Sequence, residues 1–353
     1  MVPDVVIPRP DTLQVGWGWF QILLSLTFVV HLLLMNALFG GAVVSFLGGL
    51  RKRGAGSTAA QDTSRKVPTL VALTVNAGVA PLLFLQVLYG HLFYTSSVVM
   101  AGWWFAIIPL LIIGYYAAYG TALKYDSPLR PLWSLLVVLI LAFIAFMFVN
   151  NNTMALTPGA WGRWFDVSDG SLLNLGEPTL WARWLHMLIG AVAVGGLFVA
   201  LVHERKVRAG DADAAAARDW ALPFFTHGSL AEMATGIWWL IALPGDVMRQ
   251  FMGGSMVATI LLPVGVLLGV YAVVMGFQKK VYAATALTVA TVLVMALMRE
   301  VVRFGYLDGV FHPGDLVVEP QISPLILFLA VFVIGIVSVV TMLKLAARAG
   351  KEA

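Results

Sequence analysis

Residues 17–50 read WGWFQILLSLTFVVHLLLMNALFGGAVVSFLGGL and contain no aspartate, glutamate, lysine or arginine. The stretch exceeds the roughly 20 apolar residues that a helix needs to cross a bilayer. A surface helix of a soluble protein would instead show one polar face along its length. The sequence therefore predicts a membrane-spanning helix here.

Eight further apolar runs of spanning length follow the first. The predicted spans are 17–50, 67–98, 101–123, 130–150, 181–203, 220–244, 254–277, 281–299 and 323–345. The whole chain is 60% hydrophobic and 11% charged, whereas soluble proteins carry roughly 25% charged residues. We therefore expect an all-α integral membrane protein, with residues 1–353 forming one transmembrane bundle of about nine helices.

Basic residues gather in alternate connecting segments, which sets the expected topology. They follow the first, third, fifth, seventh and ninth runs, at 51–66, 124–130, 205–208, 279–280 and 344–351. The positive-inside rule assigns these segments to the cytoplasm, with the N-terminus outside and the C-terminus cytoplasmic. We expect a multi-pass protein of a bacterial or archaeal cytoplasmic membrane. The net charge of +4 then reflects topology and predicts no nucleic-acid partner.

A few ionisable side chains lie inside the predicted spans, where burying them is costly. They are His31, His91, His186, His227 and Glu232. Histidine at membrane depth serves as a haem ligand, a proton relay or a hydrogen-bonded structural residue. Four histidines on four helices favour a cofactor. The chain has no cysteine, which excludes iron–sulfur clusters, thiolate haem ligands and covalent haem attachment.

The positions of the candidate ligands along the predicted spans indicate a haem near the outer face. His186 lies near the outer end of its helix, and Met252 and Met256 lie where the seventh run begins, also outside. Imidazole and methionine are common axial ligands of haem iron, and Met252 is the preferred partner of His186. Four arginines near the same boundary could pair with haem propionates or act as ordinary interfacial anchors. They are Arg183, Arg249, Arg299 and Arg303.

Six stretches of the chain form a recognisable series. They are FVVHLLLMNALFGGAVVSFL (28–47), VNAGVAPLLFLQVLYGHLFYTSS (75–97), LWARWLHMLIGAVAVGGLFVA (180–200), ALPGD (242–246), RQFMGGSM (249–256) and MREVVRFGYLDG (298–309). Together they resemble the large, haem-bearing subunit of the cytochrome bd quinol oxidases over roughly residues 17–312. The resemblance implies nine helices in the orientation given above.

The same resemblance implies roles for single residues. It implies that His31 ligates a high-spin haem, that His186 and Met252 ligate a low-spin haem b, and that Glu300 is a haem-ligating carboxylate. One to three haems are expected, and the ligands alone do not distinguish haem b from haem d. His91 and His227 are further candidates to complete axial ligation.

The chain also departs from the family pattern. The long quinol-binding loop is missing, since about ten residues, 245–254, join the sixth and seventh runs. The family's Gly-Arg-Gln-Pro-Trp motif gives way to Phe304, Gly305 and Tyr306. The two glutamates of the family's third helix, part of its proton path, have no counterpart in 101–123. His227 and Glu232 could form a different proton path.

Three functions remain open at this stage. The preferred one is a b-haem subunit that oxidises a membrane quinol and passes electrons to a periplasmic c-type cytochrome or a second membrane subunit. The second is a terminal quinol oxidase that reduces oxygen. The third is a haem-free proton-coupled transporter or structural subunit, although no internal repeat is evident in the sequence.

Overall fold

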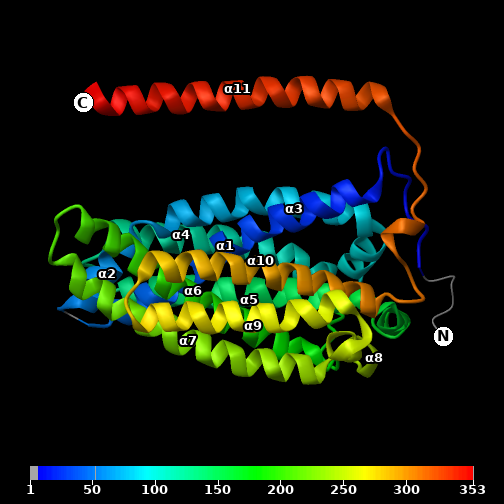
Figure 1. Ribbon diagram of the computed structural model, residues 1–353, viewed down its shortest axis with the longest axis horizontal. Coiled ribbons are helices and arrows are strands. Elements are labelled where there is room, and N and C mark those ends of the chain that lie inside the picture. Colours follow the sequence, from blue (N-terminus) through cyan, green and yellow to red (C-terminus); the bar gives the residue numbers. More distant parts are fainter. Residues whose placement is uncertain (1–6, 52, 353) are drawn as a thin grey trace.

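The computed structural model describes residues 7–51 and 53–352, and side-chain surroundings up to residue 348. Its described residues form an elongated bundle of helices without a named β-strand (Figure 1). The long helices are α1 (Trp17–Gly49), α3 (Val67–Val99), α4 (Ala101–Leu123), α5 (Arg130–Leu156), α6 (Thr179–Arg208), α7 (Ala214–Ala242), α9 (Met256–Phe277), α10 (Val281–Tyr306) and α11 (Ile322–Glu352). The short ones are α2 (Ala55–Ser64), η2 (Pro158–Phe165), α8 (Gly245–Arg249), η3 (Gln250–Gly254) and η4 (Pro313–Asp315).

Among the described residues, eight helices are long and apolar enough to cross a membrane. This confirms the expectation of an all-α, multi-pass architecture. The predicted span at 220–244 corresponds to α7, which has 29 residues but is not among those eight. Helix α7 includes Arg218, Asp219, His227 and Glu232, which lower its apolar character. The count of nine spans stays a prediction.

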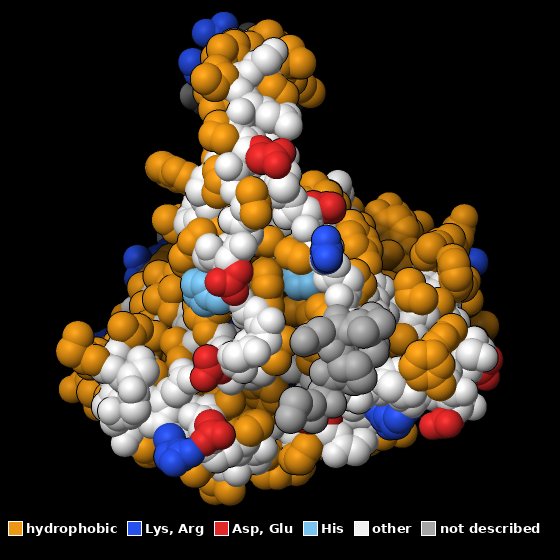
Figure 2. Space-filling model, turned by 90° about the vertical axis from the view of Figure 1, so that its right-hand side faces the viewer, with side chains coloured by type: hydrophobic (Ala, Val, Ile, Leu, Met, Phe, Trp, Pro, Cys, Tyr) orange, Lys and Arg blue, Asp and Glu red, His pale blue; other side chains and the backbone are white. Residues whose placement is uncertain are grey.

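Contacts between connecting segments mark the two ends of the bundle. At one end, Tyr125 donates to the Ser57 carbonyl, which joins two basic segments, and Lys279 pairs with Asp219 on α7. At the other end, Leu13 pairs with Val318 in a single β-bridge. Figure 2 looks onto this second end, where acidic and basic side chains both lie on the surface.

Helices α1 and α6 form the centre of the bundle and touch backbone to backbone. A Cβ added to Gly40 would lie 1.9 Å from the Ala191 carbonyl oxygen, and one added to Gly195 would lie 2.2 Å from the Gly40 carbonyl carbon. Only glycine permits such an approach, as at small-residue crossings of other membrane helices. Helix α3 packs against α1, and α7 packs against α6.

Helix α2 lies in the first basic segment, which the sequence indicated only as a connection. Its Ala59 and Ala60 are fully buried. The Asp62 carboxylate accepts from His203 Nε2 at 3.1 Å and from Lys206, both on α6. Burial alone would raise the pKa of Asp62, but the Lys206 ammonium and the His203 ring lower it below the ordinary value of 3.8.

The contacts of Asp62 allow a prediction of how well the amides of α2 are protected from hydrogen exchange. A carboxyl with a depressed folded pKa stabilises the fold above its unfolded pKa and loses that contribution as pH falls through the folded value. We expect Asp62→Asn to speed amide exchange in α2 roughly two- to fivefold at pH 7. Hydrogen exchange corrected for intrinsic rates measures this. Equal protection of α2 in both proteins at pH 7 would contradict it.

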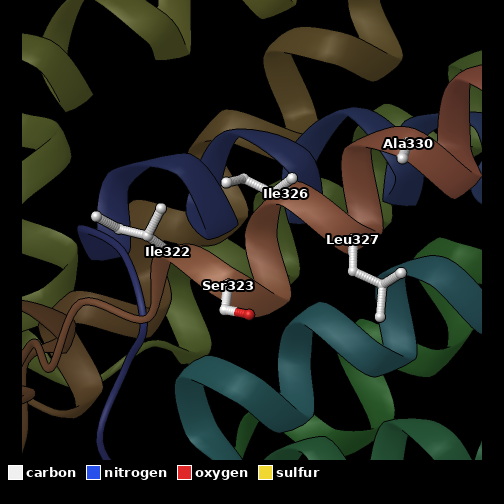
Figure 3. Close-up of a pocket in the computed structure, with 5 residues that line it drawn as sticks. All are labelled: Ile322, Ser323, Ile326, Leu327 and Ala330. Carbon is white, nitrogen blue, oxygen red and sulfur yellow. The ribbon is translucent and has the colours of Figure 1, made fainter.

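Helix α11 runs beside the bundle and apart from it (Figure 1). Every α11 side chain whose surroundings are described is exposed. Ile322, Ile326 and Leu327 line an open apolar groove along this helix (Figure 3). Such a surface suits lipid or another apolar partner.

Candidate functional site

A buried carboxylate near the C-terminal end of α10 pairs with two arginines. Glu300 on α10 is 7% exposed. Its Oε2 accepts from Arg303 Nη1 at 2.6 Å and from Gln21 Nε2 at 2.9 Å, and its Oε1 accepts from Arg299 Nη1 at 3.0 Å. Both oxygens are therefore already engaged. Here Glu300 acts as a countercharge, and an iron bond would require displacing at least one donor.

A third arginine joins this group from α6. Arg183 is 5% exposed and donates to Asn152 Oδ1, and it lies close enough to Arg303 and Arg299 for their charges to repel. Its Nε and Nη2, and Nη2 of Arg303, find no hydrogen-bond partner among the described residues. Each buried unsatisfied donor costs about 1–3 kcal/mol. The group therefore has the charge and the free donors to bind an anionic ligand.

His186 lies one turn from Arg183 on the same helix and is 8% exposed. Its Nδ1 is 3.1 Å from the Glu232 carbonyl oxygen, and its Nε2 is 3.8 Å from Glu232 Oε1. The Trp239 ring lies 5.5 Å from the imidazole and 5.1 Å from the Arg183 guanidinium. The Trp239 Nε1 has no partner among the described residues. This unpaired N–H therefore belongs to a ring that neighbours both His186 and Arg183.

His31 on α1 has the same kind of contact. Its Nδ1 lies 3.1 Å from the Thr74 carbonyl oxygen on α3. A carbonyl oxygen only accepts, so in His31, as in His186, this hydrogen bond requires the proton on Nδ1, and in a neutral ring Nε2 is then unprotonated. The remaining lone pair is then on Nε2. A histidine that ligates a metal is commonly held in this way by its second nitrogen.

A short repeat links the two histidines, although no internal repeat was evident from the sequence. His31 is followed after nine positions by Gly40 and Gly41, and His186 after nine positions by Gly195 and Gly196. Gly40 and Gly195 meet at the α1–α6 crossing. The two imidazoles are therefore at matching heights, about 13 Å from the crossing at 1.5 Å per residue. The His-x8-Gly-Gly spacing is the signal that could have revealed this pairing.

The proposed methionine ligands are outside this buried group. Met252 lies in the turn η3 and is 58% exposed, and Met256 is 77% exposed. The neighbouring Phe251, 3% exposed, occupies the interior position of that turn. Arg249 is exposed and pairs with Asp246 at the surface. These three predicted residues are therefore exposed, whereas His186 is buried.

Two of the remaining candidates have different surroundings. The His227 side chain is exposed, and its Nδ1 lies 3.0 Å from the Pro223 carbonyl oxygen of its own helix. The His91 ring packs edge-on against Phe311, with centroids 4.4 Å apart. Neither contacts Glu232 or His186 through a hydrogen bond among the described residues. Of the predicted proton path, only Glu232 lies beside the site.

The donor set can be compared with what a bare metal ion and a haem each require. No group of three or more histidine, aspartate or glutamate side chains gathers in the part of the chain that the structure describes. Haem iron needs only axial ligands from the protein, because the porphyrin supplies four nitrogens. An imidazole with a free Nε2 and unpaired guanidinium donors beside it meets the needs of iron and propionates.

No protein-family model matches the chain, and a search of curated proteins finds no relative. The resemblance to the cytochrome bd large subunit therefore rests on the stretches of sequence quoted above. The function has to be argued from the site itself.

Proposed function

We propose that this protein is a b-type haem membrane subunit. It would oxidise a membrane quinol and pass electrons, near the outer face, to a periplasmic c-type cytochrome or a second membrane subunit. The chain would cross a bacterial or archaeal cytoplasmic membrane nine times, α7 included, with its N-terminus outside and its C-terminus in the cytoplasm. The quinol, the partners and the orientation follow from the resemblance and from the positions of the basic segments.

The observation that supports the haem is a set of unpaired buried donors on the helix that carries His186 and on two helices that contact it. Two nitrogens of Arg183, one of Arg303 and one of Trp239 are buried without a partner among the described residues. Propionate oxygens would satisfy guanidinium donors at this boundary. When bound, haem supplies the one-electron chemistry of its iron.

The protein's own residues would set the site's geometry and charge. His186 would offer Nε2 to the iron, while the Glu232 carbonyl fixes its ring through Nδ1. The Glu232 carboxylate, 3.8 Å from Nε2, would have to turn aside. Arg183 and Arg303 would hold the propionates, and Glu300 would balance part of their charge. His31 would offer a second Nε2 at the same height.

Quinol-driven reduction tests the proposed function. Purified protein in lipid nanodiscs is oxidised and then mixed with a short-chain quinol. We expect the b-type absorbance to rise to most of the level that dithionite produces. A haem that dithionite reduces but none of several quinols reduces would refute quinol oxidation.

Carbon monoxide distinguishes electron transfer from oxygen reduction. If the protein only transfers electrons, every haem would be six-coordinate and low-spin and would have no free axial position. We then expect no spectral change when the gas is added to the reduced protein. A large change would favour the terminal oxidase instead.

A haem-free, proton-coupled transporter is the second candidate. The approach of the Glu232 carboxylate to His186 Nε2, at 3.8 Å with both side chains largely buried, favours it. Such pairs often mark proton relays in membrane proteins. Purified protein without a Soret band would support this candidate.

A further inference from the structure

Two glycines lie directly against the two imidazoles. The carbonyl that receives Nδ1 of His31 belongs to Thr74, four residues before Gly78 on α3. The carbonyl that receives Nδ1 of His186 belongs to Glu232, four residues before Gly236 on α7. In each case the ring reaches a carbonyl that already takes part in a helical hydrogen bond.

Only a residue without a side chain allows this approach. A Cβ at Gly78 would lie 2.8 Å from Cε1 and 3.0 Å from Nδ1 of His31. A Cβ at Gly236 would lie 3.2 Å from Cε1 and 3.4 Å from Nδ1 of His186. The 2.8 Å distance at Gly78 is shorter than any van der Waals contact, and the 3.2 Å distance at Gly236 is tighter than most such contacts. Any larger residue would therefore push the ring away from its carbonyl.

The arrangement occurs twice with similar geometry. Both Nδ1–oxygen distances are 3.1 Å, and both histidines precede the Gly40–Gly195 crossing by nine residues. Repetition on two separate helix pairs, α1–α3 and α6–α7, argues against accidental packing. It indicates that each helix pair holds its histidine ring in one tautomer.

We propose that Gly78 and Gly236 are positioning residues: each exposes a helix carbonyl that fixes the neighbouring histidine with its proton on Nδ1 and its lone pair on Nε2. The inference rests on the proposed function in one respect, that the Nε2 lone pair is used to bind iron. The tautomer itself can be measured whether or not haem is present.

The test compares Gly78→Ala and Gly236→Ala with Gly228→Ala. Gly228 is a matched control because it lies on α7 and a Cβ there would meet Ala193 of α6 at 3.1 Å, away from His186. Nitrogen-15 spectra of histidine-labelled, fully reduced protein report which ring nitrogen carries the proton, with His31→Gln and His186→Gln assigning the signals. Absorbance reports haem retention.

We expect both rings to be protonated on Nδ1 in the wild type and in Gly228→Ala. Gly236→Ala should change the His186 signal alone, and Gly78→Ala the His31 signal alone, with the larger effect at Gly78 because its contact is shorter. Haem bound at the affected histidine should be retained about tenfold less well. If Gly78→Ala does not fold, the milder Gly236→Ala decides.

Unchanged histidine signals in both alanine variants would overturn the proposal, as would Gly228→Ala changing the His186 signal equally. A wild type that contains no haem but shows both Nδ1 protons would refute the proposed function and leave the positioning role supported. The two failures are thus distinguishable.

Discussion

Replacing His186 with alanine is expected to abolish the low-spin b-type signal of the purified protein. The imidazole is buried and, with Nδ1 held by the Glu232 carbonyl, would offer its Nε2 lone pair to the iron. Loss of an axial ligand leaves the low-spin haem five-coordinate or unbound. A reduced-minus-oxidised spectrum, with haem quantified per protein, measures the effect.

His227→Ala is the matched control. His227 is also a histidine within the bundle, but its side chain is exposed and its Nδ1 bonds to its own helix at Pro223. We expect this variant to keep the wild-type spectrum. A normal low-spin spectrum in His186→Ala, or equal losses in the two variants, would contradict the assignment of His186.

Glu300→Ala is expected to be among the most destabilising single changes in the chain. The substitution leaves Arg303, 3% exposed, and Arg299 without their shared carboxylate. Breaking a buried ion pair by removing one partner typically costs about 3–5 kcal/mol, because the other charge remains buried and uncompensated. Unfolding of the purified protein in mixed micelles of a mild detergent and dodecyl sulfate measures the loss.

The pair Asp246–Arg249 supplies the control for this prediction. Like Glu300–Arg303, it joins a carboxylate to an arginine three residues away, but both side chains are largely exposed. Asp246→Ala should leave the unfolding midpoint unchanged, because solvent screens exposed pairs. Equal shifts in the two variants would show that burial of the arginines near Glu300 is not what makes that carboxylate important.

The long helices could be predicted from the sequence because a helix that crosses lipid needs an apolar run of sufficient length. The run at 101–123 coincides with α4, and that at 67–98 differs from α3 by one residue. Helix α2 was missed because it is short and nearly neutral in hydropathy. Its two buried alanines become visible only once α1 and α7 are packed around it.

Part of the candidate site could be predicted from the sequence. The cost of burying charge singled out His186, Arg183 and Arg303, and the structure finds all three buried. Methionine carries no such signal, since the chain has 14 and side-chain direction in a turn depends on local backbone. At η3 that backbone turns Phe251 inward and leaves Met252 exposed.

The contacts of His31 and His186 could not be predicted from the sequence, and the reason is different. A histidine bonded to a carbonyl on a neighbouring helix needs that helix at the right height and rotation. The glycine that permits it, Gly78 or Gly236, looks like any other among 34 in the chain. Pairing of α1 with α3 and of α6 with α7 had to be known first.

The most direct measurement is the reduced-minus-oxidised absorbance spectrum of the purified wild-type protein, taken with a chemical assay of porphyrin. Iron bound by buried imidazole predicts a Soret band, b-type visible bands and at least one porphyrin per chain. A colourless preparation that stays free of porphyrin after expression with added haem would contradict the redox function. Only the helical membrane architecture would then remain supported.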